Sequence, residues 1–270
     1  MSTVTAALSP DQVAAFRRQG YLLPGRQLLP AADFADLQAT FDGLLADWIA
    51  QGGRPEHMDV PHFRHPGLMR WLLHDDVLDV VESLLGPDLV LFSSHFICKP
   101  AGDGRRVPWH EDSAYWKGRW DPMDVVTIWL ALDASTPENG CMRVIPGSHD
   151  NGYSDYVPVE GAPEVFGTRI RPGSFDEAAA VDCVLAPGEY SLHHAKMIHG
   201  SEPNRSPRRR CGYTMRYISA AARHLGGRDD TFQIYLARGR DRAGNAYGDP
   251  TRPNAAWCEK YSPKNTPKGH

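Results

Sequence analysis

The amino-acid sequence predicts a mainly β protein with flanking α-helices, in which the strands form a barrel or a sandwich. Two patterns lead to this fold class. The first 86 residues carry apolar residues at helical spacing and helix caps, whereas short runs rich in Val, Ile, Thr and aromatic residues follow Pro87. A chain of 270 residues can form such a fold as one unit. We therefore expect a single domain over 1–270, with a helical part at about 1–86, a barrel at about 87–240 and a mobile tail at about 240–270.

Three N-terminal segments are predicted to be helical. In "SPDQVAAFRRQG", Ser9 is a candidate N-cap, Pro10 suits the first helical position and Gly20 is a stop signal. The segment "FRHPGLMRWLLHDDVLDVVESLLG" predicts one or two further helices. Between them, "PAADFADLQATFDGLLADWIAQGG" has one apolar face at helical spacing, made of Phe34, Leu37, Phe41, Leu44, Leu45 and Trp48.

The strand-like runs occur between Gly, Pro and Asn turns. They lie at 88–99, 125–135, 141–148, 182–194 and 211–221. Asn139 and Gly140 are a hairpin signal, and Pro146 with Gly147 ends the strand that follows. Several short strands at this spacing favour a barrel or a sandwich.

Composition excludes several classes of protein. A net charge of -4 gives no general reason to expect nucleic acid or an anionic membrane as partner. No window approaches a membrane span, and the N-terminus lacks the pattern of a signal peptide. The five cysteines are odd in number and far apart, with no C-x-x-C pair, which counts against a disulfide framework or zinc ribbon and for a reducing compartment. We expect a soluble cytoplasmic protein, either a monomer or a homodimer, that acts on a small molecule.

The pattern His-x-Asp occurs three times, and strand geometry distinguishes one occurrence. The three pairs are His57 with Asp59, His74 with Asp76, and His110 with Asp112. The second pair lies in a predicted helix, where side chains two residues apart diverge, and the first lies in a predicted solvated or substrate-lining loop. The third pair lies in "VPWHEDSAYW", which we expect to be extended. Because side chains two apart on a strand share a face, the third pair predicts a metal clamp.

A third ligand is expected from a later strand, with His193, His194 and His199 as candidates. His199 precedes a run that contains Arg208, Arg209 and Arg210. Two histidines and one carboxylate form the facial arrangement of non-haem Fe(II) oxygenases. A guanidinium downstream could bind the distal carboxylate of a dicarboxylate co-substrate through two parallel hydrogen bonds.

The sequence resembles the phytanoyl-CoA dioxygenase family of Fe(II)/2-oxoglutarate-dependent oxygenases. The resemblance rests on "QVAAFRRQGYLLP", "CKPAGDGRRVPWHED", "VVTIWLALDASTPENGCMRVIPGSH" and "IHGSEPNRSPRRR", which occur in the family's order over about residues 10–220. It implies a double-stranded β-helix, a cupin-like jelly-roll barrel, with helices packed on one side.

The resemblance also implies functional residues and cofactors. His110, Asp112 and His199 are expected to bind Fe(II), and Arg210 to bind the C5 carboxylate of 2-oxoglutarate, with Arg209 as the alternative if the register slips by one. O2 is the second co-substrate. The remaining residues expected to line the 2-oxoglutarate pocket are Lys99, Thr127, Trp129 and Ser201.

The expected reaction is hydroxylation of an unactivated C–H bond, because relatives that halogenate have a small residue in place of Asp112. Candidate substrates are an amino acid, a phosphonate or an intermediate of secondary metabolism. One alternative is a cupin-type metal dioxygenase or isomerase that does not use 2-oxoglutarate, which would leave the arginine run without a role. The other is a non-catalytic jelly-roll binding module, for which the ligand pattern would be coincidental.

Overall fold

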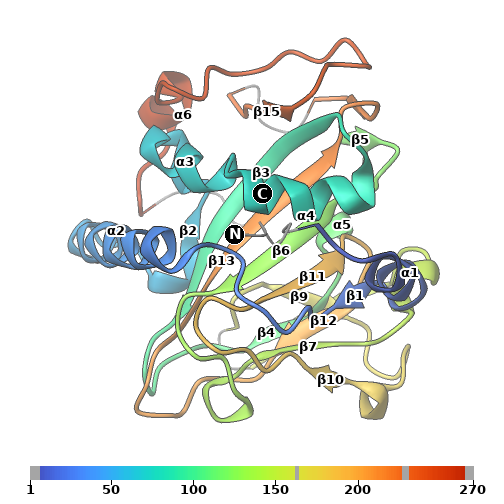
Figure 1. Ribbon diagram of the computed structural model, residues 1–270. Helices are drawn as coiled ribbons and strands as arrows, with labels where there is room; N and C mark the ends of the chain where they lie inside the picture. The colour runs from blue at the N-terminus through green and yellow to red at the C-terminus, as the bar shows by residue number, and fades with distance from the viewer. Residues whose placement is uncertain (1–6, 162–163, 227–230, 265–270) are drawn as a thin grey trace.

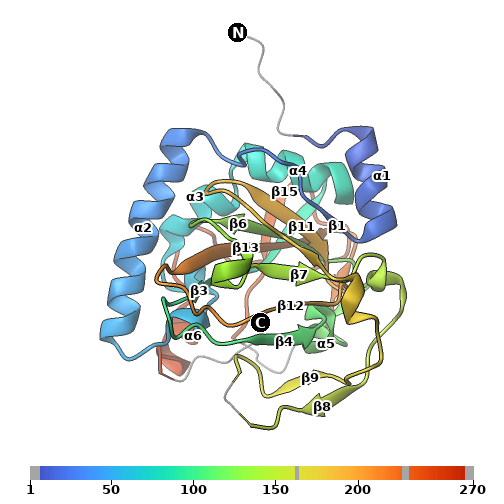
Figure 2. The same ribbon diagram turned by 90° about the horizontal axis from the view of Figure 1, so that it is seen from below.

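Two β-sheets with helices on one outer face form the protein, as a computed structural model describes it for residues 7–161, 164–226 and 231–264. The predicted fold class, mainly β with flanking helices, is confirmed. The larger sheet has the order β1-β11-β6-β13-β3-β15, with β2 also paired to β3, and the smaller has the order β10-β7-β12-β4. Among the described strands no ladder joins these two sheets into a closed ring. Figure 2 shows α1, α2, α3 and α4 at the top and upper left, on the side of the larger sheet, and the smaller sheet below with α5 beside β4.

The two longest strands of the larger sheet, β3 and β13, are almost entirely buried. They are β1 (Tyr21–Leu22), β2 (Met58–Asp59), β3 (Leu89–Lys99), β6 (Val126–Ala131), β11 (Tyr190–His194), β13 (Arg210–Ser219) and β15 (Tyr235–Arg238). The smaller sheet contains β4 (Val107–His110), β7 (Met142–Val144), β10 (Val181–Asp182) and β12 (His199–Ser201). Two further pairs stand apart: β5 (Trp120–Asp121) with β14 (Arg223–His224), and β8 (Tyr156–Pro158) with β9 (Thr168–Ile170).

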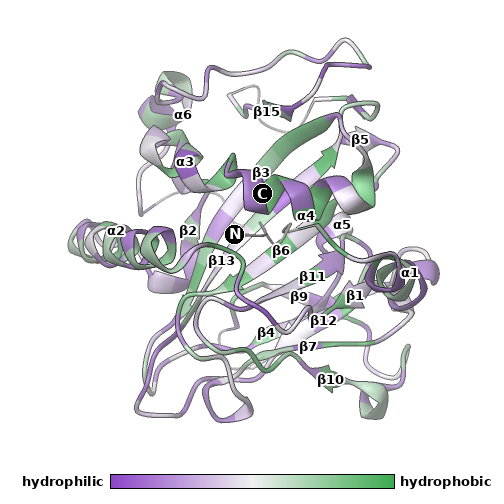
Figure 3. Cartoon of the chain, viewed as in Figure 1, coloured by the Kyte–Doolittle hydropathy of each residue, from purple (hydrophilic) through white to green (hydrophobic). Residues whose placement is uncertain are grey.

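The helices form where their caps and apolar faces predict them. They are α1 (Pro10–Gln19), α2 (Ala31–Ala50), α3 (Met69–Leu72), α4 (Asp75–Leu85), α5 (Asp112–Trp116) and α6 (Ala255–Lys260). Ser9 caps α1 through its side chain, and Gly20 ends that helix at a positive φ of 74°. The residues of the predicted apolar face of α2 are buried, except Leu44, which is partly buried. Figure 3 shows hydrophobic and hydrophilic residues alternating along α2 and α4, as expected for helices that cover a sheet.

Three local expectations differ from the structure. Asn139 and Gly140 do not form a hairpin: Asn139 ends a short 3-10 helix that Thr136 caps, because β6 and β7 belong to different sheets. Asp59 does not lie in a solvated loop but in β2, where it is 4% exposed. His74 precedes its helix and caps α4, and its Nδ1 accepts a hydrogen bond from the backbone N–H of Asp76. The His74 and Asp76 side chains therefore stay close instead of diverging.

The segment expected to be a mobile tail contains a docked helix. Trp257 of α6 is 1% exposed, and its ring lies edge-on to Phe63 at 5.2 Å between centroids. Asn254 caps the helix and donates a side-chain hydrogen bond to the carbonyl of Thr231. These contacts tie residues 254–257 to the core, and the mobility of the tail stays a prediction. The end of that tail, 265–270, lies outside the described residues.

Two of the five cysteines are paired, although the number and spacing of the cysteines count against a disulfide framework. Cys98 and Cys211 face each other across β3 and β13 and form a disulfide. They are 113 residues apart in the sequence, so only strand pairing brings them together. No helix within the described residues is long and apolar enough to cross a membrane.

Candidate active site

Two of the three expected iron ligands, His110 and His199, lie opposite each other on neighbouring strands. His199 of β12 pairs with His110 of β4 in the antiparallel ladder, and their ring centroids are 4.1 Å apart. The Nδ1 atom of His110 donates to the carbonyl of Pro108, and that of His199 donates to the carbonyl of Met197. These hydrogen bonds fix the orientation of both rings and leave both Nε2 atoms available as ligands.

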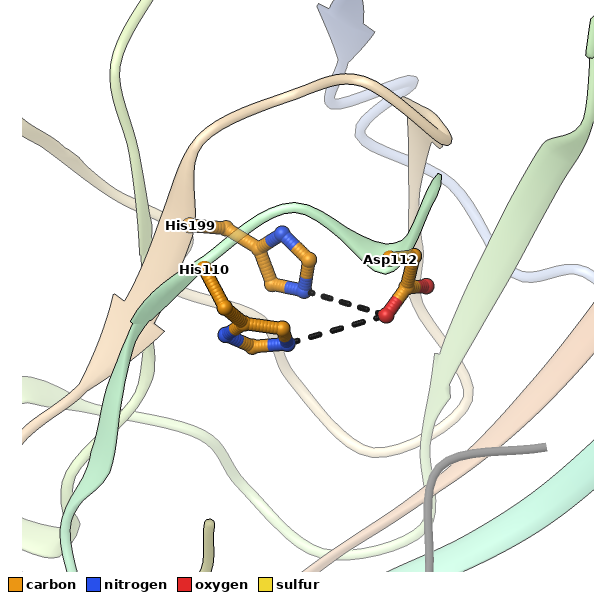
Figure 4. A group of neighbouring side chains, drawn as sticks. All are labelled: His110, Asp112 and His199. Atoms are coloured by element: carbon orange, nitrogen blue, oxygen red, sulfur yellow. Dashed lines mark ion pairs between the residues drawn. The ribbon is translucent and has the colours of Figure 1, made fainter. Parts of the chain in front are cut away.

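Asp112 completes the group, although it does not lie on the strand as predicted. It is the first residue of α5, and it still converges with His110 because Glu111 between them is extended, with φ −115° and ψ 131°. One carboxylate oxygen, Oδ1, lies 3.6 Å from His110 Nε2 and 3.9 Å from His199 Nε2 (Figure 4). Ligand atoms of the three side chains all lie within 4.8 Å of one another.

The electrostatics of the three side chains suit a cation. Burial raises the pKa of the Asp112 carboxyl, but the Arg216 cation and the nearby histidines outweigh it and hold that pKa well below its usual value. Burial, with the neighbouring His110 and His193, lowers the pKa of His199 well below its ordinary value. A charged carboxylate and a neutral imidazole are the protonation states that bind a metal ion. Two nitrogens and one oxygen on one side leave the rest of a coordination sphere open, as in a facial triad.

A pocket opens from this group into the space between the sheets. Including its open mouth it holds about 680 Å³ of empty space. Apolar and aromatic residues make up much of its wall: Ile97, Val107, Tyr115, Trp116, Trp129, Met142, Val165 and Phe166. Its polar wall residues besides the three candidate ligands are Glu56, His95, His193, Ser201, Arg210, Thr214 and Arg216.

Arg210 lines this pocket, and the position of its guanidinium distinguishes it from its neighbours. It is 2% exposed, and Nε and Nη2 have no hydrogen-bond partner within the described part of the chain. Its guanidinium lies 5.3 Å from the ring of Trp129. That ring lies against Gly212, where a Cβ atom would come within 2.1 Å of it. A buried guanidinium with unpaired N–H groups indicates a site for an anion.

Arg209 and Arg208 lie elsewhere. Arg209 points away from the pocket to Asp42 and Asp133, at 2.7 Å and 3.0 Å. Arg208 is exposed and precedes β13. Because neighbouring side chains of an extended chain point to opposite faces, Arg209 is turned away from the pocket that Arg210 lines.

The four further residues expected in the co-substrate pocket divide into two pairs. Trp129 and Ser201 line the pocket, whereas Lys99 and Thr127 are buried outside its wall. Lys99 on β3 is the register partner of Arg210 on β13. Its Nζ donates to the carbonyls of Ser201 and Glu202. Burial and the Arg210 cation lower the pKa of Lys99 to about 6. The hydroxyl of Thr127 is buried without a hydrogen-bond partner among the described residues.

The structure adds pocket residues that sequence reasoning missed. Arg216 lies on the same face of β13 as Arg210, six residues later, so strand alternation from Arg210 could have found it. Phe166 comes from the connection between β8 and β9, and its ring centroid is 4.9 Å from that of His110. No sequence signal marked it. His193, a candidate third ligand, lines the pocket beside His199, whereas His194 contacts Asp124 instead.

Comparison with known proteins places this geometry in a family. The family model described as phytanoyl-CoA dioxygenase (PhyH) matches residues 3–212. The chain belongs to the phytanoyl-CoA dioxygenase family. This is the family of Fe(II)/2-oxoglutarate-dependent oxygenases that the sequence resembles, and the match covers all eight residues expected to bind iron or 2-oxoglutarate.

Individual relatives are about 28–31% identical to this chain over the part that matches. A probable alpha-ketoglutarate-dependent hypophosphite dioxygenase of Stutzerimonas stutzeri is 31% identical over 60% of this chain and 56% of its own length. The ectoine dioxygenase of Sphingopyxis alaskensis is 28% identical over 76% of this chain and 74% of its own. The apo structure of ThoJ, a non-heme monooxygenase, superposes with a TM-score of 0.74 at 31% identity and covers 88% of both chains. The matched part spans about half the length of several curated relatives, such as the human peroxisomal phytanoyl-CoA dioxygenase at 48%.

Proposed function

We propose that this protein is an Fe(II)- and 2-oxoglutarate-dependent dioxygenase that hydroxylates an unactivated C–H bond of a small metabolite. The observation that carries the proposal is the pairing, in one pocket, of a His-Asp-His group with a buried arginine whose Nε and Nη2 find no partner among the residues that the structure describes. The first needs a cation and the second needs an anion. Iron and 2-oxoglutarate supply both.

His110, Asp112 and His199 would hold the iron, and their donor set of two imidazoles and one carboxylate fits Fe(II). An iron ion held there would supply the chemistry that couples O2 activation to the conversion of 2-oxoglutarate into succinate and CO2. The chain's own residues supply orientation and exclude water.

Arg210 would bind the distal carboxylate of 2-oxoglutarate. Burial lowers its pKa to about 10, so the guanidinium is still a cation at neutral pH. The Trp129 ring beneath it restricts the guanidinium plane, which favours two parallel hydrogen bonds to a carboxylate. Ser201, which is buried in the same wall, offers a hydroxyl to the co-substrate. Lys99 is the register partner of Arg210, and its lowered pKa leaves it mostly neutral at pH 7, so it would become a second cation by taking up a proton when the carboxylate binds.

The substrate would lie against the aromatic part of the wall. Tyr115 and Phe166 lie next to the His110 ring, at 5.9 Å and 4.9 Å between centroids. The only lysine or arginine side chains in the described pocket wall are Arg210 and Arg216, and Arg216 already contacts Asp112. A compact molecule such as an amino acid, a phosphonate or an intermediate of secondary metabolism suits this enclosed space. Relatives named for hypophosphite and for ectoine support a small substrate.

Within the described part of the chain, Nε and Nη2 of Arg210 have no partner, which favours this proposal over a barrel enzyme that does not use 2-oxoglutarate. The clustered ligands favour it over a binding module. The test is a panel of candidate metabolites screened for substrate-stimulated succinate formation from 2-oxoglutarate. Asp112→Ala should abolish both anaerobic iron uptake and succinate formation. His74→Ala, which removes a histidine from another His-x-Asp pair, should keep both. Full iron occupancy and activity in the Asp112 variant would refute the assignment.

A further inference from the structure

The two carboxylate oxygens of Asp112 face different groups. Oδ1 is the oxygen nearest to the two candidate histidine ligands, at 3.6 Å and 3.9 Å (Figure 4). Oδ2 faces the opposite way, and lies 3.5 Å from Nε of Arg216 and 3.7 Å from Nε2 of His193. A carboxylate whose oxygens are separated in this way can offer one of them to a metal ion while the other is held by the protein.

Arg216 is itself fixed on several sides. It is 5% exposed, it donates to the hydroxyl of Ser93 at 3.3 Å, and its guanidinium lies 5.2 Å from the ring of Trp116. Ser93 is its register partner on β3, so the contact comes from the sheet itself. Trp116 is the last residue of α5, the short helix that Asp112 begins. One guanidinium therefore contacts both ends of that helix.

His193 approaches the same oxygen from another strand. It lies on β11, and its ring centroid is 4.7 Å from that of His199. Its two ring nitrogens are buried without a hydrogen-bond partner in the described residues, so the 3.7 Å approach to Asp112 is its nearest polar contact given by the structure. It is absent from the group of side chains whose ligand atoms lie within 4.8 Å of one another. His193 thus belongs to the surroundings of Asp112 and not to the candidate ligands.

We propose that Arg216 is a positioning residue that, together with His193, holds Oδ2 of Asp112 and presents Oδ1 alone to the metal. The inference rests on the proposed function, because it assumes that Asp112 is a metal ligand. Without Arg216 the Asp112 carboxylate could rotate, and Oδ2 would then compete for a coordination position that the co-substrates need. Groups that orient a ligand in this way typically change metal affinity by about 10- to 100-fold when they are removed.

The test measures metal binding without turnover, by titrating the purified protein with Co(II) in the absence of 2-oxoglutarate. Arg216→Met should weaken Co(II) binding by about 10- to 100-fold. It should also alter the visible absorption of the Co(II) protein, which reports the ligands around the ion. Arg216→Lys, which keeps the charge, should recover part of the affinity. Arg119→Met is the matched control, because Arg119 is also buried, at 7% exposed, but its guanidinium lies over Phe232 outside the pocket wall.

A merely structural role would lower thermal stability and leave the Co(II) affinity and spectrum of the folded fraction unchanged. A folded Arg216→Met protein with wild-type Co(II) affinity and spectrum overturns the inference. If that variant does not fold, Arg216→Lys and His193→Asn decide, since each should still weaken Co(II) binding and change the spectrum. Wild-type protein that binds no Co(II) would instead refute the proposed metal site, and this inference with it.

Discussion

Replacing Arg210 with alanine should specifically remove the binding of 2-oxoglutarate. The guanidinium is 2% exposed before any ligand binds, so most of the desolvation of this cation has already occurred on folding. Truncating one partner of a buried, hydrogen-bonded charge pair costs about 2–5 kcal/mol. At about 1.4 kcal/mol per factor of ten, the dissociation constant should rise by about 30-fold to several thousand-fold.

The assay is calorimetric titration of 2-oxoglutarate into protein loaded with Mn(II), which needs no substrate and allows no turnover. Arg210→Lys should be intermediate, because a lysine keeps the charge and loses the planar fork that matches a carboxylate. Metal affinity should be nearly unchanged in both variants, since the candidate ligands are His110, Asp112 and His199 and a guanidinium does not ligate a metal ion.

Arg209→Ala and Arg208→Ala are the matched controls. Arg209 is 39% exposed and pairs with Asp42 and Asp133, and Arg208 is exposed before β13, so neither change should weaken 2-oxoglutarate binding more than about twofold. The reasoning fails if a folded Arg210→Ala protein binds 2-oxoglutarate like the wild type. If the Arg209→Ala variant loses 2-oxoglutarate binding instead, Arg209 is the residue that binds the distal carboxylate.

Three further outcomes are expected. Because the Lys99 pKa is lowered to about 6 before a carboxylate binds, 2-oxoglutarate binding should take up a proton above pH 6 and weaken as the pH rises further. Calorimetry in buffers of different ionisation enthalpy measures the proton uptake, and the Lys99→Met variant should show none. Burial lowers the pKa of His62 to about 3, below its unfolded value of 6.5, so the unfolded chain binds more protons and stability is lost as the pH falls from 6.5 towards 3. His62→Gln should therefore reduce the slope of the unfolding free energy against pH by up to about 1.4 kcal/mol per pH unit. An unchanged slope in urea titrations would contradict this. Trp257→Ala should destabilise the protein by about 3–5 kcal/mol, because its ring is buried against Phe63, whereas an equal unfolding midpoint would mean that α6 adds nothing to the core.

Features that depend on neighbouring residues could be predicted from the sequence. The start and end of α1 follow from Ser9 and Gly20, whose side chain and backbone freedom act within one turn. The pairing of His110 with Asp112 depends only on an extended residue between them, so it survives although Asp112 begins a helix. The resemblance to a family then supplied His199 and Arg210, which local chemistry alone left among several candidates.

Tertiary structure decided what depends on residues far apart in the chain. The ladder between β4 and β12 places His199 opposite His110, and strand alternation turns Arg210 inwards and Arg209 outwards. Pairing of β3 with β13 joins Cys98 to Cys211. The docking of α6 and the approach of Arg216 to Asp112 likewise have no local signal. Periodicity and caps act over a few residues, whereas contacts across two sheets depend on the register and spacing of whole strands, which a single sequence does not state.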